Sequence, residues 1–190
     1  MRIAVIGTGN IGGTLGGRWR TAGQDVVYGG RNPGGTGPGG APVLAMADAV
    51  SSADVVLLAV PGKAVPEVAG ALGGALDGKV VIDAANRMGE PEANSQATIT
   101  AAAPGARYAR AFNTLGWENF ADPLPGTDLF FASDPQARGT VEELISALGL
   151  GPVYVGGADA VRAVDSLLGL WFALMQQNGG NRKLAFRLVR

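Results

Sequence analysis

The chain has 190 residues, of which 47% are hydrophobic and 16% are charged, and its net charge at pH 7 is −1. This length fits one α/β domain with a well-formed core, or such a domain with a small appendage, but not two full domains. The near-zero net charge offers no electrostatic basis for binding nucleic acid or anionic lipid. Cysteine and histidine are absent, which excludes disulfides and thiol catalysis and removes the commonest metal ligand, so we predict no metal site.

The first two thirds of the chain alternate short apolar runs with helix-compatible segments. Strands are expected at residues 3–6, 26–28, 55–60, 80–82 and 108–111, and helices at residues 10–22, 44–52, 63–76 and 95–103. Strands that are apolar on both faces and separated by helices are typical of a parallel sheet covered on each side. The pattern predicts an α/β fold with a doubly wound parallel sheet of the Rossmann type.

Two segments depart from this alternation. Residues 29–42 are nearly all glycine and proline, which disfavours helix and strand alike, and we interpret them as a surface connection rather than a dedicated binding loop. Beyond residue 114 we expect a small C-terminal α/β extension, residues 115–190. Its expected elements are strands at 129–132 and 153–155, a helix at 135–148 and a long apolar helix at 158–177. The apolar stretch of that last helix is too short to span a bilayer and is interpreted as core or dimer interface.

The first expected strand is followed directly by a glycine-rich string, which reads Gly7-Thr8-Gly9-Asn10-Ile11-Gly12. Such spacing is weak evidence in a chain with 31 glycines, but its place between a strand and a helix is typical of a dinucleotide-binding loop. Gly7 would permit the tight turn, Gly9 would let the backbone approach a pyrophosphate, and Gly12 would let the helix pack close to the sheet. The anion would lie at the helix N-terminus, where free N–H groups favour negative charge.

The end of the second strand indicates which dinucleotide is bound. An NAD-preferring site presents Asp or Glu to the ribose hydroxyls roughly 20 residues beyond the loop, but the nearest acid, Asp25, lies before the expected strand. Arg31 instead offers a fork of donors to a ribose 2′-phosphate, with Asn32 and the Gly30 backbone as helpers. We therefore predict NADP as the cofactor. The alternative for Arg31 is an ordinary solvated arginine.

Three further strand ends should border the ribose and nicotinamide, because ligands of open α/β sheets lie beyond the carboxyl ends of the strands. Cofactor contacts are expected from Ala59, Val60, Pro61, Ala85 and Asn86. Orienting roles at the reacting rings are expected from Asn86, Asn113 and Thr114.

No proton donor for a carbonyl substrate is evident near these strand ends. The three lysines, Lys63, Lys79 and Lys183, fall at a helix start, a strand start and in the tail, and no Tyr-x-x-x-Lys pair occurs. A ketone or hydroxyacid reductase needs a positioned group that handles a proton as hydride moves. A site without such a group suits hydride transfer between two redox cofactors, since the chemistry then resides in the cofactors.

Several motifs together point to a family: residues 3–12, Gly30-Arg31, Ala59-Val60-Pro61, Ala111-Phe112-Asn113-Thr114, Gly116-Trp117-Glu118-Asn119-Phe120 and Asp165-Ser166-Leu167. With them the chain resembles, over nearly its whole length, the reductases that pass hydride between NADP and the deazaflavin coenzyme F420. Many Rossmann enzymes share the N-terminal motifs, whereas the segment from Phe112 onward is more distinctive. Similar NADPH-dependent flavin-reducing domains occur in membrane metalloreductases.

The resemblance implies an NADP-binding Rossmann domain at residues 1–114 and a C-terminal part, residues 115–190, that completes the deazaflavin pocket and contributes to a homodimer. It also implies that residues 7–11, Arg31 and residues 59–61 contact NADP. Archaeal members carry histidine where this chain has Asn113. After the fourth strand, related bacterial chains often have the sequence Asp-Ala-Thr-Asn-Pro, whereas this chain has Asp83-Ala84-Ala85-Asn86-Arg87. Arg87 would either pair with an anionic substrate or be solvated.

The sequence therefore favours an oxidoreductase that transfers hydride between NADP(H) and coenzyme F420 or a flavin-like acceptor. Two alternatives stay open: an NADPH-dependent reductase of a small ketone or imine, with solvent or Arg87 as the proton source, and a non-catalytic NADPH-sensing protein. The expected partners are a small-molecule redox acceptor and a second copy of the chain, with no nucleic acid and no membrane. A cytoplasmic location is expected because a strand pattern, not a signal-peptide pattern, follows Met1.

Overall fold

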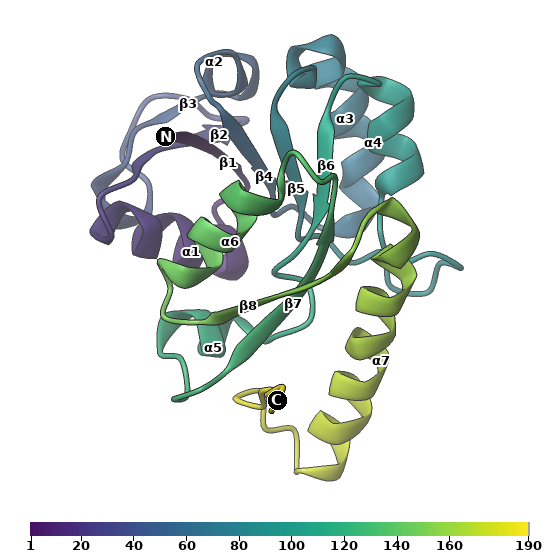
Figure 1. Cartoon of the computed structure of the whole chain (residues 1–190). Helices are drawn as coiled ribbons and strands as arrows, with labels where there is room; N and C mark the ends of the chain where they lie inside the picture. Colours follow the sequence, from purple (N-terminus) through teal and green to yellow (C-terminus); the bar gives the residue numbers. More distant parts are fainter. Residues whose placement is uncertain (190) are drawn as a thin grey trace.

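A computed structural model describes residues 1–189 and shows an eight-stranded sheet at the centre of the fold (Figure 1). The strands are β1 (Arg2–Ile6), β2 (Asp25–Gly30), β3 (Val43–Ala45), β4 (Val55–Leu58), β5 (Val80–Asp83), β6 (Arg107–Arg110), β7 (Asp128–Ser133) and β8 (Gly151–Gly156). Their order is β3-β2-β1-β4-β5-β6-β7-β8, and every neighbouring pair is parallel except β6 and β7. The chain winds outward from β1 in one direction and from β4 in the other, which confirms the doubly wound Rossmann-type prediction.

Helices cover both faces of this sheet. They are α1 (Asn10–Thr21), α2 (Met46–Ser51), α3 (Val65–Leu72), α4 (Gln96–Ala102), α5 (Trp117–Ala121), α6 (Arg138–Ser146) and α7 (Val161–Gln177), with 3-10 turns at Pro38–Gly40, Gly62–Ala64, Gly73–Leu76 and Ala158–Ala160. One core cluster joins the sheet to α1, α5 and α6, and the other joins it to α2, α3, α4 and the first turns of α7. Successive side chains of a strand point to opposite faces, so each central strand contributes side chains to both core clusters.

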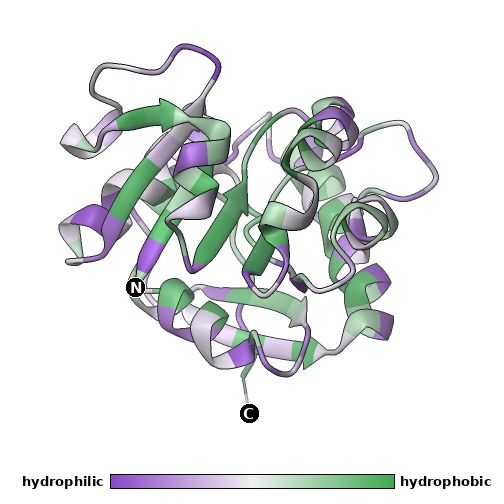
Figure 2. Cartoon of the chain, turned by 90° about the horizontal axis from the view of Figure 1, so that it is seen from above, coloured by the Kyte–Doolittle hydropathy of each residue, from purple (hydrophilic) through white to green (hydrophobic). Residues whose placement is uncertain are grey.

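The strands therefore contain few polar residues. Ile3 and Val5 of β1 lie in the first core and Ala4 and Ile6 in the second, all at most 1% exposed. Figure 2 shows the consequence, with apolar strands in the middle of the molecule and most hydrophilic residues in the loops and on outward parts of the helices.

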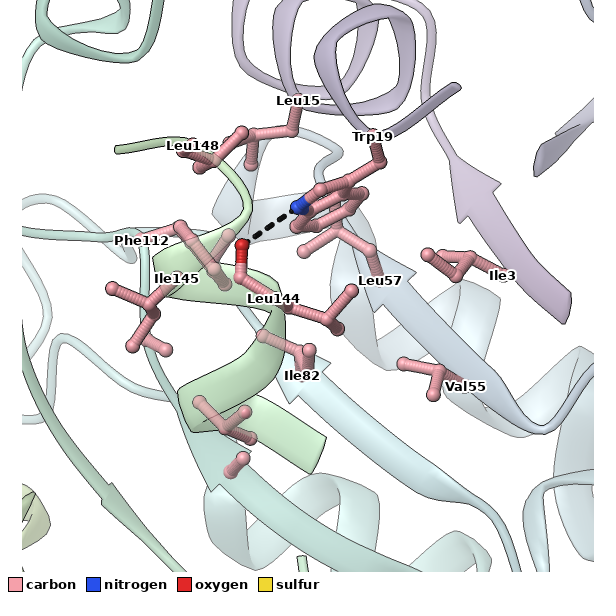
Figure 3. Packing of buried hydrophobic residues seen from close by; sticks show 14 of the residues in the cluster. Ile3, Leu15, Trp19, Val55, Leu57, Ile82, Phe112, Leu144, Ile145 and Leu148 are labelled. Carbon is pink, nitrogen blue, oxygen red and sulfur yellow. Dashed lines mark hydrogen bonds between the residues drawn. The ribbon is translucent and has the colours of Figure 1, made fainter. Parts of the chain in front are cut away.

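Trp19 of α1 links the N-terminal part of the chain to the C-terminal part. Its ring is fully buried, and its indole Nε1–H donates to the carbonyl oxygen of Leu144 in α6 at 2.9 Å (Figure 3). The ring of Phe112 meets it edge to face, with the ring centroids 5.5 Å apart. The helix that follows the glycine-rich string thus packs directly on the C-terminal part of the fold.

The surface connection predicted for residues 29–42 begins later than expected, so the prediction is wrong at its start. Gly29 and Gly30 belong to β2, and Pro38–Gly40 form a 3-10 turn. The helix expected from residue 44 is preceded by β3, because Val43 and Leu44 pair with Tyr28 and Gly29 of β2. Gly29 lets α2 and Ile6 of β1 approach the end of β2, since a Cβ there would lie 2.5 Å from Cδ1 of Ile6 and 3.2 Å from Cα of Met46.

Among the other elements in the first part of the chain, two differ most from the prediction. The strand expected at residues 55–60 ends at Leu58. The single helix expected at residues 63–76 divides into a 3-10 turn, α3 and a second 3-10 turn, because Gly73 has a φ of +45° and leaves the helical conformation.

The C-terminal part adds β7 and β8 to the same sheet, and α7 then runs alongside it. Only one face of α7 is buried, through Val161, Val164, Leu168 and Trp171, whereas Leu170 is 49% exposed. The last helix is thus amphipathic rather than apolar all round. Within residues 1–189, no helix combines the length and the hydropathy that a membrane crossing requires.

Candidate functional site

The strand order reverses between β1 and β4, and the loops that follow these two strands touch. Gly7 follows β1 with a φ of +113°, a conformation that favours glycine. A Cβ at Gly7 would lie 2.5 Å from the carbonyl oxygen of Ala59, which follows β4. In an open α/β sheet this reversal point, at the carboxyl ends of the strands, is where ligands bind.

Two further glycines of this loop, Gly12 and Gly9, have different surroundings: Gly12 is closely packed and Gly9 faces open space. A Cβ at Gly12 would lie 2.0 Å from the carbonyl oxygen of Gly7, so α1 can approach the sheet only with glycine there. Gly9, which precedes α1, has no heavy atom within 4 Å of a Cβ position, and no side chain caps the helix. The first N–H groups of α1 therefore face open space, and the loop fits the pyrophosphate of a dinucleotide. Thr8 and Asn10 are exposed and Ile11 is half-buried beside it.

The second strand ends next to this loop. Because Ile6 of β1 pairs with Gly29 of β2, Gly30 and Arg31 lie at the same edge as Gly7. Arg31 and Asn32 are exposed, and no hydrogen bond or ion pair of the Arg31 side chain is recorded within residues 1–189. Asp25 is the first residue of β2, at the opposite edge, where it pairs with Arg2 at 2.6 Å. An acidic side chain is therefore absent from the end of β2, and Arg31 stands there instead.

The loops after β4 and β5 border an open cavity of about 480 Å³. They meet closely, since a Cβ at Gly62 would lie 2.3 Å from the carbonyl oxygen of Asn86. The cavity is lined by Pro61, Gly62, Lys63, Pro66, Asn86, Arg87, Met88 and Glu90. Arg87 is partly exposed and lies 3.7 Å from Glu90.

Asn86 and Asn113, which follow β5 and β6, are brought together. The Nδ2 of Asn86 donates to the carbonyl oxygen of Asn113 at 2.9 Å, and its Oδ1 accepts from Nη2 of Arg110 at 2.7 Å. Asn113 is 3% exposed and Thr114 is 1% exposed. The chain turns at Phe112, whose φ of +61° is unusual for a residue with a side chain. Strained backbone of this kind often accompanies a binding site.

A buried polar cluster lies beneath these two asparagines. Asp83 accepts from the backbone N–H groups of Ala85 and Ser95, at 3.1 and 2.7 Å, and from the hydroxyl of Tyr108 at 3.0 Å. Burial raises the pKa of Asp83, and the Arg110 guanidinium and these donors oppose that shift. Burial also raises the pKa of the Tyr108 hydroxyl, which stays protonated and continues to donate. The cluster therefore pins the ends of β5 and β6 to one another.

The comparisons with known proteins agree with this geometry. The family model described as NADP oxidoreductase, coenzyme F420-dependent, matches residues 2–87. A structure of a hypothetical protein from Sinorhizobium meliloti is 30% identical, with a TM-score of 0.71, over 83% of this chain and 85% of that one. A candidate F420-dependent NADP reductase from Arthrobacter sp. FB24 is 25% identical, with a TM-score of 0.86, over the full length of both chains. The chain belongs to the F420-dependent NADP oxidoreductase family.

One curated relative of this family member is much longer. Metalloreductase STEAP3 of Rattus norvegicus is 28% identical over 177 residues, which are 87% of this chain and 36% of the relative. The chain thus spans about a third of that protein. As its family indicates, the chain is an NADP-dependent oxidoreductase.

The sequence of this oxidoreductase predicted the residues at the strand ends, but not the buried polar cluster beneath Asn86 and Asn113. Arg110, Asp83 and Tyr108 were not singled out as a group. The available signal was an arginine at the end of an otherwise short, buried strand, where a charged residue needs a partner. The roles assigned to the glycine-rich loop, to Arg31, to Asn86, Asn113 and Thr114, and to Arg87 stay predictions.

Proposed function

We propose that this family member transfers hydride between NADP(H) and coenzyme F420 or a flavin-like acceptor. The carrying observation is a cavity of about 480 Å³ at the carboxyl ends of β4 and β5. One of its lining residues, Pro61, lies two residues after Ala59, whose carbonyl oxygen lies against Gly7 of the dinucleotide loop. Pockets for small molecules and cofactors commonly have volumes of roughly 300–1,000 Å³. A planar redox ring fits such a space, and the name given to the Arthrobacter protein is consistent with this acceptor.

In this proposal the two parts of the site have separate tasks. The backbone at Gly7, Thr8, Gly9, Asn10 and Ile11 binds the pyrophosphate, while Gly30, Arg31 and Asn32 bind the 2′-phosphorylated ribose. Ala59, Val60, Pro61 and Ala85 border the nicotinamide half. Asn86, Asn113 and Thr114 orient the rings. NADPH, when bound, supplies the hydride, and the protein holds donor and acceptor in contact and limits access of water.

An assay of NADPH oxidation with different acceptors tests this function. We expect turnover with purified F420, FMN or FAD, and none with small ketones or with ketone and amine mixtures. Hydride transfer between two redox rings needs no positioned proton donor from the protein, and the cavity has no histidine, cysteine or tyrosine, only Lys63 and Glu90, to serve as one. The loss of absorbance at 340 nm measures it. Turnover restricted to carbonyl compounds or imines would instead favour a ketone or imine reductase. Tight NADPH binding without any turnover would favour the NADPH-sensing alternative.

We also propose that two copies of the chain associate through the outward face of α7. That face carries no charge between Leu167 and Leu174, and Leu170 and Leu174 are 49% and 39% exposed. Exposed apolar side chains grouped on one helix face are typical of an association surface.

Replacing Leu170 and Leu174 together by glutamate should convert a dimer to a monomer, because each carboxylate would lose its hydration in the contact. Sedimentation velocity measures the change. Leu124→Glu is the matched control, since Leu124 is also 39% exposed but lies in the loop before β7; this variant should remain dimeric. A wild-type protein that sediments as a monomer at micromolar concentration would refute the proposal.

A further inference from the structure

Arg110, the last residue of β6, carries a fully buried guanidinium to the carboxyl edge of the sheet. Its Nε donates to Oδ1 of Asp165 in α7 at 2.8 Å. Its Nη1 donates to the carbonyl oxygens of Asp83 and Ala85, and its Nη2 donates to Oδ1 of Asn86 at 2.7 Å. Four of the five N–H groups of the guanidinium are thereby used. This one side chain joins β5, β6 and α7.

Stability alone does not explain such an arrangement. Replacing a buried ion pair by apolar side chains of similar volume is often neutral or stabilising, because two charges must be desolvated to form it. Val81 and Tyr108, which lie two residues before Asp83 and Arg110 on the same face of the sheet, are buried in the second core, so an apolar side chain would also suit this region. We therefore look for the role of Arg110 in the residues that it positions, which are Asn86 and Asp165.

Arg110 determines which way the Asn86 amide faces. Because Oδ1 of Asn86 accepts from the guanidinium, its Nδ2 is directed to the carbonyl oxygen of Asn113. The reversed amide would place N–H groups against the N–H groups of Arg110. Asn86 also lines the cavity, so its orientation at the site is fixed from the buried side.

Arg110 acts on Asn113 through Asp165. Oδ1 of Asp165 accepts from Arg110 and lies 3.4 Å from Nδ2 of Asn113, while Oδ2 accepts from Asn94 at 2.8 Å. A carboxylate can only accept, so the amide nitrogen of Asn113 turns toward it. The Oδ1 of Asn113 is left buried and has no hydrogen-bond partner among residues 1–189. A buried acceptor without a partner is costly and marks a place where a donor is missing.

The nicotinamide carboxamide of the cofactor could supply the donor that Oδ1 of Asn113 lacks. Asn113 and Asn86 follow β6 and β5, at the edge where the proposed function places the nicotinamide, and the nicotinamide carboxamide has two N–H donors. We propose that Arg110 is a positioning residue that, through Asn86 and Asp165, holds the free Oδ1 of Asn113 ready to accept a hydrogen bond from the nicotinamide carboxamide. This inference rests on the NADP(H)-binding part of the proposed function and not on the identity of the acceptor.

Two ligands that differ only at the nicotinamide end test the inference by isothermal titration calorimetry. NADPH has the carboxamide, whereas 2′-phospho-ADP-ribose has the same adenosine phosphate and pyrophosphate without the nicotinamide. In Arg110→Lys the charge between Asp83 and Asp165 remains, but an ammonium cannot also bridge to Asn86. We expect NADPH affinity to fall about three- to tenfold, the range for one neutral hydrogen bond, while the affinity for 2′-phospho-ADP-ribose stays within about twofold.

Three other substitutions complete the test. Asn113→Ala removes the acceptor itself and should give the same ligand-selective loss as Arg110→Lys. Arg107→Lys is the matched control, because Arg107 lies on the same strand but at its amino end, where it donates to the carbonyl oxygen of Gly78; it should change neither affinity. If Arg110→Lys does not fold, Asp165→Asn, which keeps the side-chain volume, should give the selective loss in its place.

Different results would count against different claims. Equal losses for both ligands in Arg110→Lys would show a general structural role and overturn the inference. Loss of NADPH affinity in Asn113→Ala but not in Arg110→Lys would overturn the positioning role. No acceptor is present in these titrations, so failure of the wild-type protein to reduce F420 or flavins would count against the proposed function alone.

Discussion

Replacing Gly9 with valine is expected to lower NADPH affinity at least 100-fold while leaving the fold intact. Gly9 lies in an extended conformation, with φ −70° and ψ −170°, which valine adopts readily, and a Cβ there meets no protein atom within 4 Å. The added isopropyl group would instead occupy the space in front of the α1 N–H groups, where the pyrophosphate is expected to bind. Valine is a poorer N-cap than glycine, a cost of about 1 kcal/mol.

Calorimetric titration with NADPH and a thermal unfolding scan separate these effects. A cost of that size should lower the thermal midpoint by only about 2–4 °C. Gly70→Ala is a control in α3, where a Cβ also meets open space. Gly12→Ala is the opposite case, since its Cβ would lie 2.0 Å from the carbonyl oxygen of Gly7 and should lower both stability and binding. Wild-type NADPH affinity in Gly9→Val would contradict the placement of the pyrophosphate.

Arg31→Ala is expected to weaken NADPH binding about 30- to 100-fold and to leave NADH binding within about twofold. The estimate follows from the loss of charge-assisted hydrogen bonds to a 2′-phosphate, worth roughly 1.5–3 kcal/mol each. NADH lacks that phosphate and therefore gains nothing from Arg31. Because Arg31 is exposed and has no recorded partner within residues 1–189, its removal should not alter thermal stability.

Arg2→Ala provides the matched control for this prediction. It removes the same charge from an exposed arginine, but at the amino edge of the sheet, where Arg2 pairs with Asp25. Its affinities for NADPH and NADH should equal those of the wild-type protein at the same ionic strength. If Arg31→Ala weakens both dinucleotides equally, Arg31 does not bind the 2′-phosphate and is an ordinary surface residue.

The sequence predicted those elements whose conformation is determined by residues close together in the chain. The apolar run at residues 3–6, the glycine spacing after it and the helix at Asn10 each follow from neighbouring residues, and together they place the dinucleotide loop. β3 was missed because three half-buried residues form a strand only through pairing with β2, about 15 residues away. The helix expected at residues 63–76 ignored Gly73, whose left-handed conformation depends on its surroundings.

In the candidate site, too, some features follow from neighbouring residues and others depend on residues far apart in the sequence. Asn86 and Asn113 were predictable, because polar residues that follow buried strands of a parallel sheet meet at one edge. Their support was not, because Arg110 finds Asp165 on a helix that begins 51 residues later and Asp83 on a different strand. Nothing in the local sequence around Arg110 identifies either partner. The free Oδ1 of Asn113 becomes evident only when all its neighbours are known.

The contact between Trp19 and Leu144 has a consequence for how this protein can be divided or fused. The helix that is proposed to present its N–H groups to the pyrophosphate is buried on its other side against α5, α6 and the turn after α6, including Phe120, Leu144 and Leu148. Cutting the chain after residue 114 would leave the large indole of Trp19 facing water. A working module for transplantation into a longer polypeptide is therefore the whole sheet with its C-terminal helices, and not the nucleotide-binding half alone.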